Sequence, residues 1–428
     1  MTMPKLLIRN GRVIDPANGR DEVADVLIRD GRIEAVGPGL SAGGAEILEA
    51  AGLVVAPGFI DMHAHLREPG FEHAETIETG RRAAAAGGFT SVCPMPNTAP
   101  VNDNPTVTSY IIERASRHAC TNVFPVGAVT AGSKGEALAE IGSMKQAGAV
   151  AISDDGLPVM NARVMRRAME TARSFGLPVI QHCEDLNLSA GGVMHEGMLS
   201  TRLGLRGIPG CAEDVIVARD ILLAEDTGAR YHMAHISTRR SLEMVAQAKA
   251  KGLAITCEAT PHHISLSDAT MPSYDSNYKM KPPLRSPEDV AAVADGIASG
   301  IVDVIATDHA PHPGSEKMQE FERCPFGIIG FETALGIALE VLYHSGKISL
   351  ARLVALFTAG PAAILRLDRG TLSPGAAADV TIFDPERPWT YDLNKSLSKS
   401  RNSPYHGRTF RGGAAVTIVD GEVVWRRE

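Results

Sequence analysis

The chain has 428 residues, of which 44% are hydrophobic and 21% charged, and its formal net charge is −8. This length allows a large buried core and is long for one small domain, while the negative charge argues against broad nucleic-acid binding. No basic run predicts binding to a membrane surface, and no apolar run is long enough to span a bilayer. Met1–Gly11 lacks the apolar region of a signal peptide. Six scattered cysteines without a Cys-x-x-Cys pair indicate a reducing, cytoplasmic setting.

Both ends of the chain carry strand patterns. Asn10-Gly11, Asp30-Gly31 and, near the other end, Asp420-Gly421 each stand between two apolar runs. Asn-Gly and Asp-Gly pairs in that position are strong hairpin signals, so we expect three hairpins. We therefore predict a small β-sandwich domain formed by both termini, with a large domain inserted between them. The expected boundaries are 1–56 and 366–428 for the small domain and 57–365 for the large one.

The middle of the chain alternates strand patterns with helical patterns. The clearest helix runs from Asn161, a good N-cap, to Phe175, with an apolar stripe that includes Phe175 and a stop at Gly176. Eight such β-then-α units predict an α/β fold, a (β/α)8 TIM-like barrel. A doubly wound open sheet is the alternative, which the lack of a Gly-x-Gly-x-x-Gly motif weakens. The expected strands lie near residues 59–63, 89–93, 122–127, 149–153, 177–182, 229–235, 253–257 and 302–307.

The first barrel strand predicts a metal site. It lies in the segment Gly58–Gly70 and ends in His63 and His65. Side chains alternate along a strand, so these two imidazoles point the same way and can bind one ion. Asp61 shares that face and is a candidate to orient a ligand. Two ordinary histidines near a turn are the alternative, but more candidate ligands follow at other strand ends.

Later strands end in the same kinds of side chain. The carboxyl ends of the strands in such a barrel meet at one face, so these side chains should lie together. Four imidazoles and two carboxylates exceed the three protein ligands typical of one catalytic zinc, which indicates two ions. His/Asp sets of this kind suit zinc, with manganese or cobalt as alternatives. The candidates are His63, His65, His182, His235, Asp308 and one member of the Asp154-Asp155 pair, between which strand parity does not choose.

Several motifs resemble those of metal-dependent amidohydrolases, and within that superfamily the dihydroorotases of the bacterial type I group. The turn Pro96–Thr98 and the stretch Asp154–Gly156 favour this group, whereas Leu66–Gly70 is shared with allantoinases. Hydantoinases and allantoinases usually place a carboxylated lysine where this chain has Asp155. The resemblance runs nearly end to end and is carried by Gly58–Gly70, Met95–Thr98, Asp154–Gly156, His182–Asp185, His235–Ser237, Pro282–Arg285, Ala306–His312 and Pro325–Gly330.

The resemblance implies a reaction, the reversible hydrolysis of (S)-dihydroorotate to N-carbamoyl-L-aspartate in pyrimidine biosynthesis. It implies a hydroxide that bridges two zinc ions, with Asp308 as general base and acid. It also implies a homodimer acting on this small molecule, with association with aspartate transcarbamoylase as an open question. By position, His63, His65 and Asp308 bind the first ion, His182 and His235 the second, and Asp155 bridges them.

The resemblance also implies substrate contacts. Arg67 offers a planar fork to a carboxylate, although a surface ion pair with Glu68 or Glu72 is the alternative. Lys281 departs from the family, whose members commonly have Asn there; it either meets a substrate carboxylate or turns to solvent. The expected substrate-binding residues are Arg67, Asn97, Lys281, His312, Phe326 and Gly327.

The stretch His309–Gly330 is long for a loop after a barrel strand, and we expect a lid with fixed ends and a movable middle. His262 and His263 are expected either to orient ligands or to pack. The other histidines should lie on surfaces or in loops: His73, His118, His195, His344 and His406. Two alternative functions stay open, another cyclic-amide hydrolase (a hydantoinase or allantoinase) and a non-catalytic dihydroorotase-like scaffold for aspartate transcarbamoylase, the latter disfavoured because all six ligands are kept.

Overall fold

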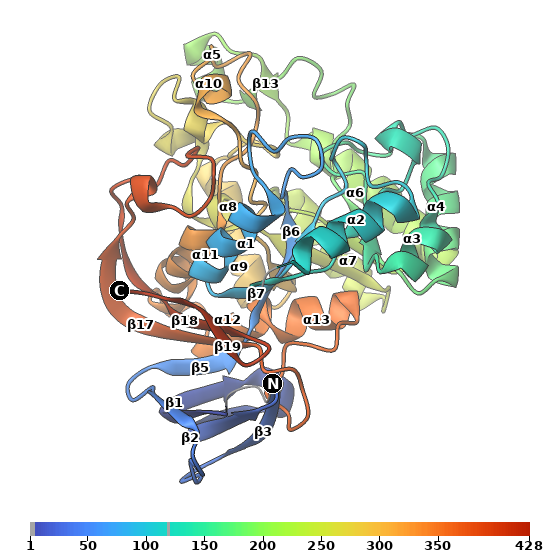
Figure 1. The fold of residues 1–428 in the computed structure, drawn as a ribbon. Coiled ribbons are helices and arrows are strands. Elements are labelled where there is room, and N and C mark those ends of the chain that lie inside the picture. Colours follow the sequence, from blue (N-terminus) through green and yellow to red (C-terminus); the bar gives the residue numbers. More distant parts are fainter. Residues whose placement is uncertain (1–4, 118–119) are drawn as a thin grey trace.

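A barrel of parallel strands lies at the centre of the computed structural model, which describes residues 5–117 and 120–428 (Figure 1). Two hydrogen-bonded sheets form it, in the orders β6-β7-β8 and β16-β15-β14-β11-β10-β9. Every predicted barrel strand is present, with one of them divided into β8 and β9. The strands are β6 (Phe59–Ala64), β7 (Phe89–Pro94), β8 (Asn122–Val123), β9 (Val126–Gly127), β10 (Ala151–Ile152), β11 (Val179–Gln181), β14 (Tyr231–Met233), β15 (Ile255–Ala259) and β16 (Val304–Ile305).

Backbone hydrogen bonds join the first and last strands of the barrel. The N–H of Asp308 donates to the carbonyl of His63 at 2.9 Å, and the N–H of His65 donates to the carbonyl of His309 at 2.8 Å. Because the strands are parallel, their carboxyl ends lie at one rim. The closure therefore brings residues about 245 positions apart in sequence to that rim, which confirms the predicted (β/α)8 class.

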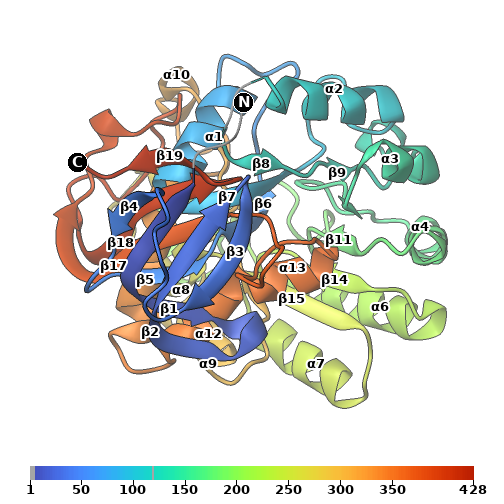
Figure 2. The same ribbon diagram turned by 60° about the horizontal axis from the view of Figure 1, so that its bottom comes forward.

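Helices surround the barrel, as Figure 2 shows for α2, α3, α4, α6 and α7. In α4 the side chain of Asn161 accepts hydrogen bonds at the N-terminus and Gly176 follows the last turn with a φ of 68°, as predicted. Phe175, expected in the buried stripe, instead lies beyond the helix end and is 41% exposed. The main helices are α1 (Ile77–Ala86), α2 (Pro105–Ala115), α3 (Ile141–Ala147), α4 (Ala162–Ser174), α6 (Cys211–Thr227), α7 (Arg239–Ala250), α9 (Pro287–Ala298), α11 (Phe331–Ala338), α12 (Leu350–Phe357) and α13 (Ala359–Leu365). In the described part of the chain, no helix combines the length and apolarity that crossing a membrane requires.

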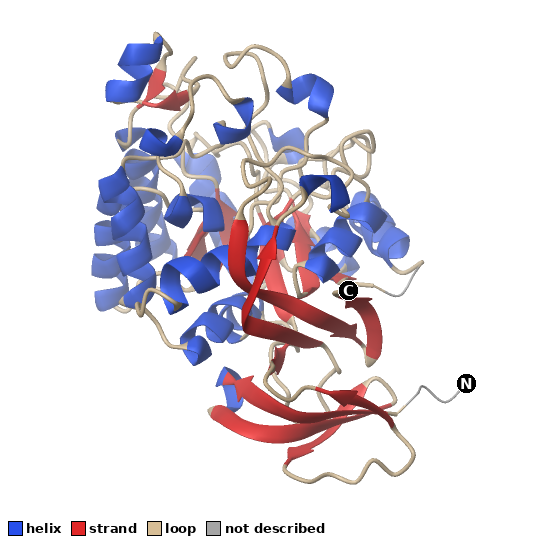
Figure 3. Cartoon of the chain, turned by 90° about the vertical axis from the view of Figure 1, so that its left-hand side faces the viewer, coloured by secondary structure: helices blue, strands red, loops and turns tan. Residues whose placement is uncertain are grey.

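The two ends of the chain form a β domain beside the barrel (Figure 3). Its strands follow the order β19-β18-β17-β5-β1-β2-β3, with β4 beside β1, and residues from both ends, among them Ile8, Val26, Val380 and Ile418, pack in one core. We propose the domain boundaries given above, near residues 57 and 365. The strands are β1 (Leu6–Asp15), β2 (Arg20–Arg29), β3 (Arg32–Gly37), β4 (Glu46–Glu49), β5 (Val54–Pro57), β17 (Val380–Thr390), β18 (Thr409–Val419) and β19 (Glu422–Arg426).

Two of the three predicted hairpins are present. Asp30-Gly31 joins β2 to β3, and Asp420-Gly421 joins β18 to β19. The prediction for Asn10-Gly11 is wrong, because this pair forms a bulge inside β1. Asn10 has a φ of 62° and its N–H donates to Asp25 Oδ1 at 2.9 Å, while a Cβ on Gly11 would lie 2.4 Å from a methyl carbon of Val55. The glycine thus lets β1 pass close to β5.

Between β17 and β18 the chain leaves the β domain and reaches the barrel rim. The hydroxyl of Ser400 donates to the carbonyl of Ala74 at 2.7 Å, and the side-chain amide of Asn402 donates to the carbonyl of Ala310 at 2.9 Å. C-terminal residues therefore help to shape the face of the barrel at which the strands end.

Candidate metal centre and substrate cavity

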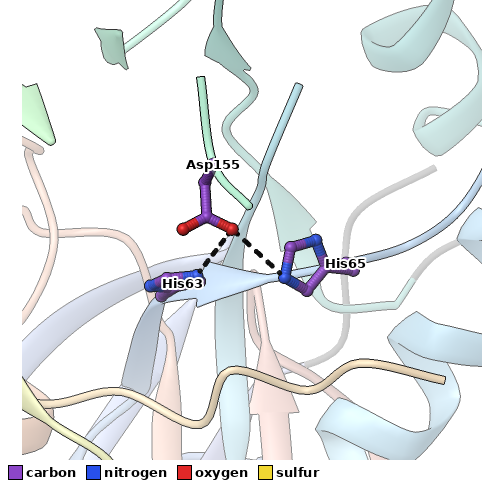
Figure 4. A group of neighbouring side chains, drawn as sticks. All are labelled: His63, His65 and Asp155. Carbon is purple, nitrogen blue, oxygen red and sulfur yellow. Dashed lines mark ion pairs between the residues drawn. The ribbon is translucent and has the colours of Figure 1, made fainter. Parts of the chain in front are cut away.

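Two groups of buried side chains meet at Asp155. Figure 4 shows the first of them, formed by His63, His65 and Asp155. In the first group, Nε2 of His63 and Nε2 of His65 lie 3.3 and 3.5 Å from Asp155 Oδ2. In the second, Nδ1 of His182 and Nε2 of His235 lie 3.8 and 3.6 Å from Asp155 Oδ1. Each carboxylate oxygen therefore faces a different pair of imidazoles, which is the arrangement that a carboxylate shared by two ions requires.

Asp308 belongs to the first group. Its Oδ1 lies 3.0 Å from His65 Nε2 and 3.6 Å from His63 Nε2. Asp308, His235 and Arg67 all have positive φ values, of 48°, 32° and 61°. Non-glycine residues rarely adopt this conformation, and it collects at functional sites where the surrounding structure holds it in place.

The donor atoms of both groups fit divalent cations. Nε2 of His63 and Oδ1 of Asp155 are buried and, among the described residues, have no hydrogen-bond partner. Buried polar atoms are normally satisfied, and a cation bound between the two groups would satisfy these. In the second group, Nδ1 of His182 and Nε2 of His235 lie 2.9 Å apart beside the same carboxylate oxygen, so their lone pairs can converge on one cation. Imidazole nitrogen with carboxylate oxygen suits zinc, manganese or cobalt.

The far nitrogens of three imidazoles contact oxygen atoms that fix the rings. Nδ1 of His63 lies 2.5 Å from Glu258 Oε1, and Nε2 of His182 lies 2.8 Å from Glu184 Oε2. Nδ1 of His65 lies 2.9 Å from Oδ1 of Asn97, which was predicted only to contact substrate. Such partners set the tautomer and orientation of a ligating imidazole.

Neither Glu258 nor Glu184 was predicted from the sequence to have a role in the site. The available signal for Glu258 was a carboxylate inside the otherwise uncharged strand β15. Glu184 lies two residues after His182, within a motif already singled out. The role of each carboxylate can be assigned only when the imidazole ring that it contacts is known.

The carboxyl groups of the centre stay ionised although they are buried. Burial alone would raise the pKa of Asp155, but the surrounding imidazoles, His63 first, hold that pKa well below its usual range. Burial likewise opposes ionisation of Glu258, and contacts with His63 and His232 outweigh it and lower the pKa to about 2. Burial opposes protonation of His63, but Asp155 and Glu258 outweigh it and raise the pKa of that ring well above its usual value, so a divalent cation that binds here would displace a proton.

The structure distinguishes Asp154 from Asp155. Asp154 turns away from the histidines, and its Oδ1 accepts hydrogen bonds from the N–H groups of Val129 at 2.8 Å and Thr130 at 3.0 Å. Asp61, a candidate to orient a ligand, instead accepts from the backbone N–H groups of His63 and Thr307, both at 3.1 Å. It joins the first and last strands and, within the part of the chain that the structure describes, makes no hydrogen bond or ion pair with an imidazole ring.

A cavity of about 350 Å³ opens onto the two groups. Nε of Arg67 donates to the carbonyl of Pro311 at 3.1 Å, and Nη2 lies 3.1 Å from Nε2 of His312. Glu68 pairs with Arg114 at 2.7 Å, so the surface pair of Arg67 with Glu68 is not formed. All predicted site residues except His63, which is fully buried beneath, line the cavity: His65, Arg67, Asn97, Asp155, His182, His235, Lys281, Asp308, His312, Phe326 and Gly327.

The charges on the cavity wall follow from burial. Burial lowers the pKa of Arg67 to about 10, so its guanidinium stays charged near neutral pH. Burial and the nearby Arg67 cation lower the pKa of His312 to about 2, so this imidazole is neutral and can accept from Arg67. The cavity therefore presents a cation with planar donors, suited to a carboxylate.

Lys281 lies on the same wall and does not point freely into solvent. Its Nζ lies 2.8 Å from Oε1 of Glu184 and 5.1 Å from the ring centre of Phe326. Glu184 is the residue that contacts His182, so Lys281 is connected through one carboxylate to a predicted ligand.

The remaining histidines are less directly involved. His263 is held by Thr260 and by the carbonyl of Pro282, and burial lowers its pKa to about 4, which favours the packing interpretation. The ring of His262 lies 4.5 Å from that of His263. His73 and His406 are exposed as expected, His195 and His344 are half-buried, and His118 lies outside the described residues.

Comparison with known proteins places the chain among enzymes with this architecture. A family model described as "Dihydro-orotase-like" matches residues 52–241, and one described as "Amidohydrolase family" matches residues 217–425. The dihydroorotase of Solibacter usitatus is 68% identical over 99% of this chain and 98% of its own length, and that of Geobacter metallireducens is 53% identical over 99% and 100%. The solved L-hydantoinase (dihydropyrimidinase) from Arthrobacter aurescens superposes with a TM-score of 0.88 over 99% of this chain and 96% of its own, and at 24% identity it shows the fold alone.

The barrel with a His/Asp centre at its carboxyl rim, together with the full-length curated relatives, identifies a metal-dependent hydrolase of cyclic amides. The identity to curated relatives extends across both the barrel and the β domain. The chain belongs to the dihydroorotase family.

Proposed function

We propose that the protein catalyses the reversible hydrolysis of (S)-dihydroorotate to N-carbamoyl-L-aspartate in pyrimidine biosynthesis. The observation that carries this proposal is the carboxylate of Asp155, each oxygen of which faces a separate pair of imidazoles beside a cavity containing a guanidinium group. Full-length relatives that carry the name dihydroorotase support it. The alternative, a hydantoinase, is supported by the similarity of this fold to that of a solved hydantoinase. Similarity of fold does not identify a substrate.

The proposed cofactor is a pair of zinc ions, with manganese or cobalt as substitutes. His63, His65 and Asp308 would hold one ion, His182 and His235 the other, and Asp155 both. When bound, divalent ions supply Lewis-acid polarisation of a carbonyl and lower the pKa of water. Glu258, Glu184 and Asn97 keep the imidazoles oriented through the ring nitrogens that face away from the ions.

In this proposal the protein groups bind substrate and move one proton. The guanidinium of Arg67 binds the substrate carboxylate, with Asn97, Lys281 and His312 around it. Phe326 and Gly327 offer backbone groups to the ring. Asp308, whose carboxylate reaches both the first group and the cavity, takes a proton from the attacking water and returns it to the ring nitrogen that leaves.

We also propose a cytoplasmic homodimer. All six cysteines are free thiols in the structure, which suits a reducing compartment. Association with aspartate transcarbamoylase is a further proposal. Sedimentation analysis of the protein alone and mixed with that enzyme tests both.

The deciding experiment measures metal content and substrate range in one preparation. We expect about two divalent ions per chain, turnover of (S)-dihydroorotate in both directions, loss of activity with a chelator and recovery with zinc. Hydantoin and allantoin serve as competing substrates. Turnover of either one without turnover of dihydroorotate would establish the other cyclic-amide hydrolase, and a metal-replete protein inactive on all three would establish the scaffold.

A further inference from the structure

Two lysine ammonium groups are buried beside the cavity, and their hydrogen bonds in the described structure go to backbone carbonyls. Lys279 is 2% exposed and Lys317, at the end of α10 (Gly314–Lys317), is 5% exposed. Among the described residues, no carboxylate oxygen lies within 4.0 Å of either Nζ. Lysine is rarely buried unless paired, because removing its charge from water is costly. Some other set of polar atoms must therefore compensate for that cost.

The compensating atoms for Lys279 are backbone carbonyls. Its Nζ donates to the carbonyls of Phe321 at 2.6 Å, Glu322 at 3.1 Å and Cys324 at 2.7 Å. These bonds use all three N–H groups of one ammonium. The same Nζ lies 4.5 Å from the ring centre of Phe326, within the range of a cation–π contact. The ammonium group of Lys279 therefore contacts four of the residues between 321 and 326 and holds this stretch together.

Lys317 does the same for the next residues. Its Nζ donates to the carbonyls of Pro325 at 3.0 Å, Gly327 at 3.1 Å and Lys279 at 3.4 Å. The carbonyl of Lys279 also accepts from the N–H of Gly327 at 2.9 Å. The two lysines are therefore linked, and the peptide groups on both sides of Phe326 are held.

The buried side-chain amide of Asn402, in the segment between β17 and β18, makes further contacts with this wall. Nδ2 of Asn402 donates to the carbonyls of Gly327 at 3.0 Å and Ala310 at 2.9 Å, and its Oδ1 accepts from the N–H of His312 at 3.1 Å. Gly327 has a φ of 121°, and a Cβ there would lie 2.6 Å from the Cβ of Ala310. The cavity-lining residues 310, 312 and 327 are thus fixed to one another.

We propose that Lys279 and Lys317 are positioning residues that hold the segment 321–327 as a preformed wall of the substrate cavity. The pair is called the ammonium clamp below. The identity of the substrate rests on the proposed function, but the clamp itself does not. From the length of the loop His309–Gly330 we expected a movable middle. In this proposal residues 321–327 of that loop are held in place instead, because their carbonyls accept hydrogen bonds from two buried cations.

The test compares Lys317→Met and Lys279→Met with wild type and with Lys251→Met. Methionine is unbranched and apolar and has no donor. Lys251 is exposed and does not line the cavity, so Lys251→Met is the control. We expect unchanged metal content and a KM for dihydroorotate raised about tenfold or more in both clamp variants, with a smaller change in kcat. Amide hydrogen exchange should become faster within residues 318–328 and stay unchanged elsewhere. Lys251→Met should match wild type in every measurement.

Three further variants keep the result decisive. Lys317→Arg retains a cation with several donors and should recover part of the KM, whereas Lys317→Gln should not. Asn402→Ala should speed exchange near residue 327 while both cations remain. Soluble, metal-replete clamp variants with the KM and local exchange of wild type overturn the proposal. So does a global loss of folding in all lysine variants at these positions, because the cations would then serve the whole fold.

The same measurements distinguish failure of the clamp from failure of the proposed function. If wild type does not turn over dihydroorotate, the proposed function is wrong, and the exchange comparison still tests the clamp without substrate. If wild type is active and exchange is unaltered in Lys279→Met and Lys317→Met, the clamp alone is wrong.

Discussion

Nζ of Lys281 lies 2.8 Å from Oε1 of Glu184, and the other oxygen of this carboxylate lies 2.8 Å from Nε2 of His182. Burial opposes ionisation of Glu184, but His182 and Lys281 outweigh it and hold the pKa of the carboxyl below its usual range. The lysine that departs from the family pattern is thus connected to a proposed metal ligand, in addition to lining the cavity.

This contact predicts the effect of Lys281→Met. Without the cation, Glu184 binds a proton more readily and holds His182 less firmly. We expect the affinity for the second metal ion to fall about tenfold, measured by competition with a chelator, and kcat/KM to fall with it. Lys281→Arg should keep the metal. A raised KM with unchanged metal affinity would show that Lys281 acts on substrate alone.

The two neighbouring aspartates should behave differently when each is replaced by alanine. Asp155→Ala removes the carboxylate between the two groups, so we expect loss of metal and of activity. Asp154→Ala should keep most of its metal and instead lose stability, by about 1–3 kcal/mol, because the N–H groups of Val129 and Thr130 lose their acceptor. Elemental analysis and denaturant unfolding measure both effects. Two tightly bound ions in Asp155→Ala would exclude the bridging role.

Asp308→Asn tests the proton transfer. An amide oxygen can still coordinate an ion but cannot accept and return a proton, so we expect at least one ion per chain and a kcat reduced about a thousandfold. In wild type the hydrolytic rate should fall as the pH falls through the pKa of this group, since protonation removes the base. Near-normal turnover by Asp308→Asn would rule out this role.

A buried carboxyl that does not line the cavity, that of Asp220, predicts a pH effect on stability. Asp220 is fully buried, and burial raises its pKa to about 6 despite contacts with Arg219 and Tyr231. The folded state therefore holds this proton more tightly than the unfolded state, whose pKa is near 3.8. The stabilisation is present below pH 4 and is lost as the pH rises through 6, by up to about 3 kcal/mol.

Asp220→Asn should remove that dependence. Urea unfolding of both proteins, each treated with a chelator, should show wild type losing stability relative to the variant between pH 4 and pH 7. Parallel stability curves over this interval would contradict the raised pKa.

The sequence alone predicted most of the barrel and the grouping of the candidate ligands. Alternation along a strand places His63 and His65 on one face, and the common direction of parallel strands brings His182, His235 and Asp308 to the same rim. These relations depend on local spacing and on topology, which the order of residues contains. They did not distinguish Asp154 from Asp155, because that choice depends on which backbone N–H groups lie beside each carboxylate.

Only the tertiary structure decided the remaining features. Asn10-Gly11 has the pattern of a hairpin, but the close approach of Val55 makes it a bulge, and a dipeptide carries no information about a strand some 40 residues away. Glu258 gains its role from His63, which is 195 positions distant. Lys279 and Lys317 have no motif, since their partners are backbone carbonyls, which every residue possesses. The fold decides which carbonyls lie beside a buried ammonium group. The residue types that carry those carbonyls do not indicate this, so the contacts cannot be predicted from the sequence.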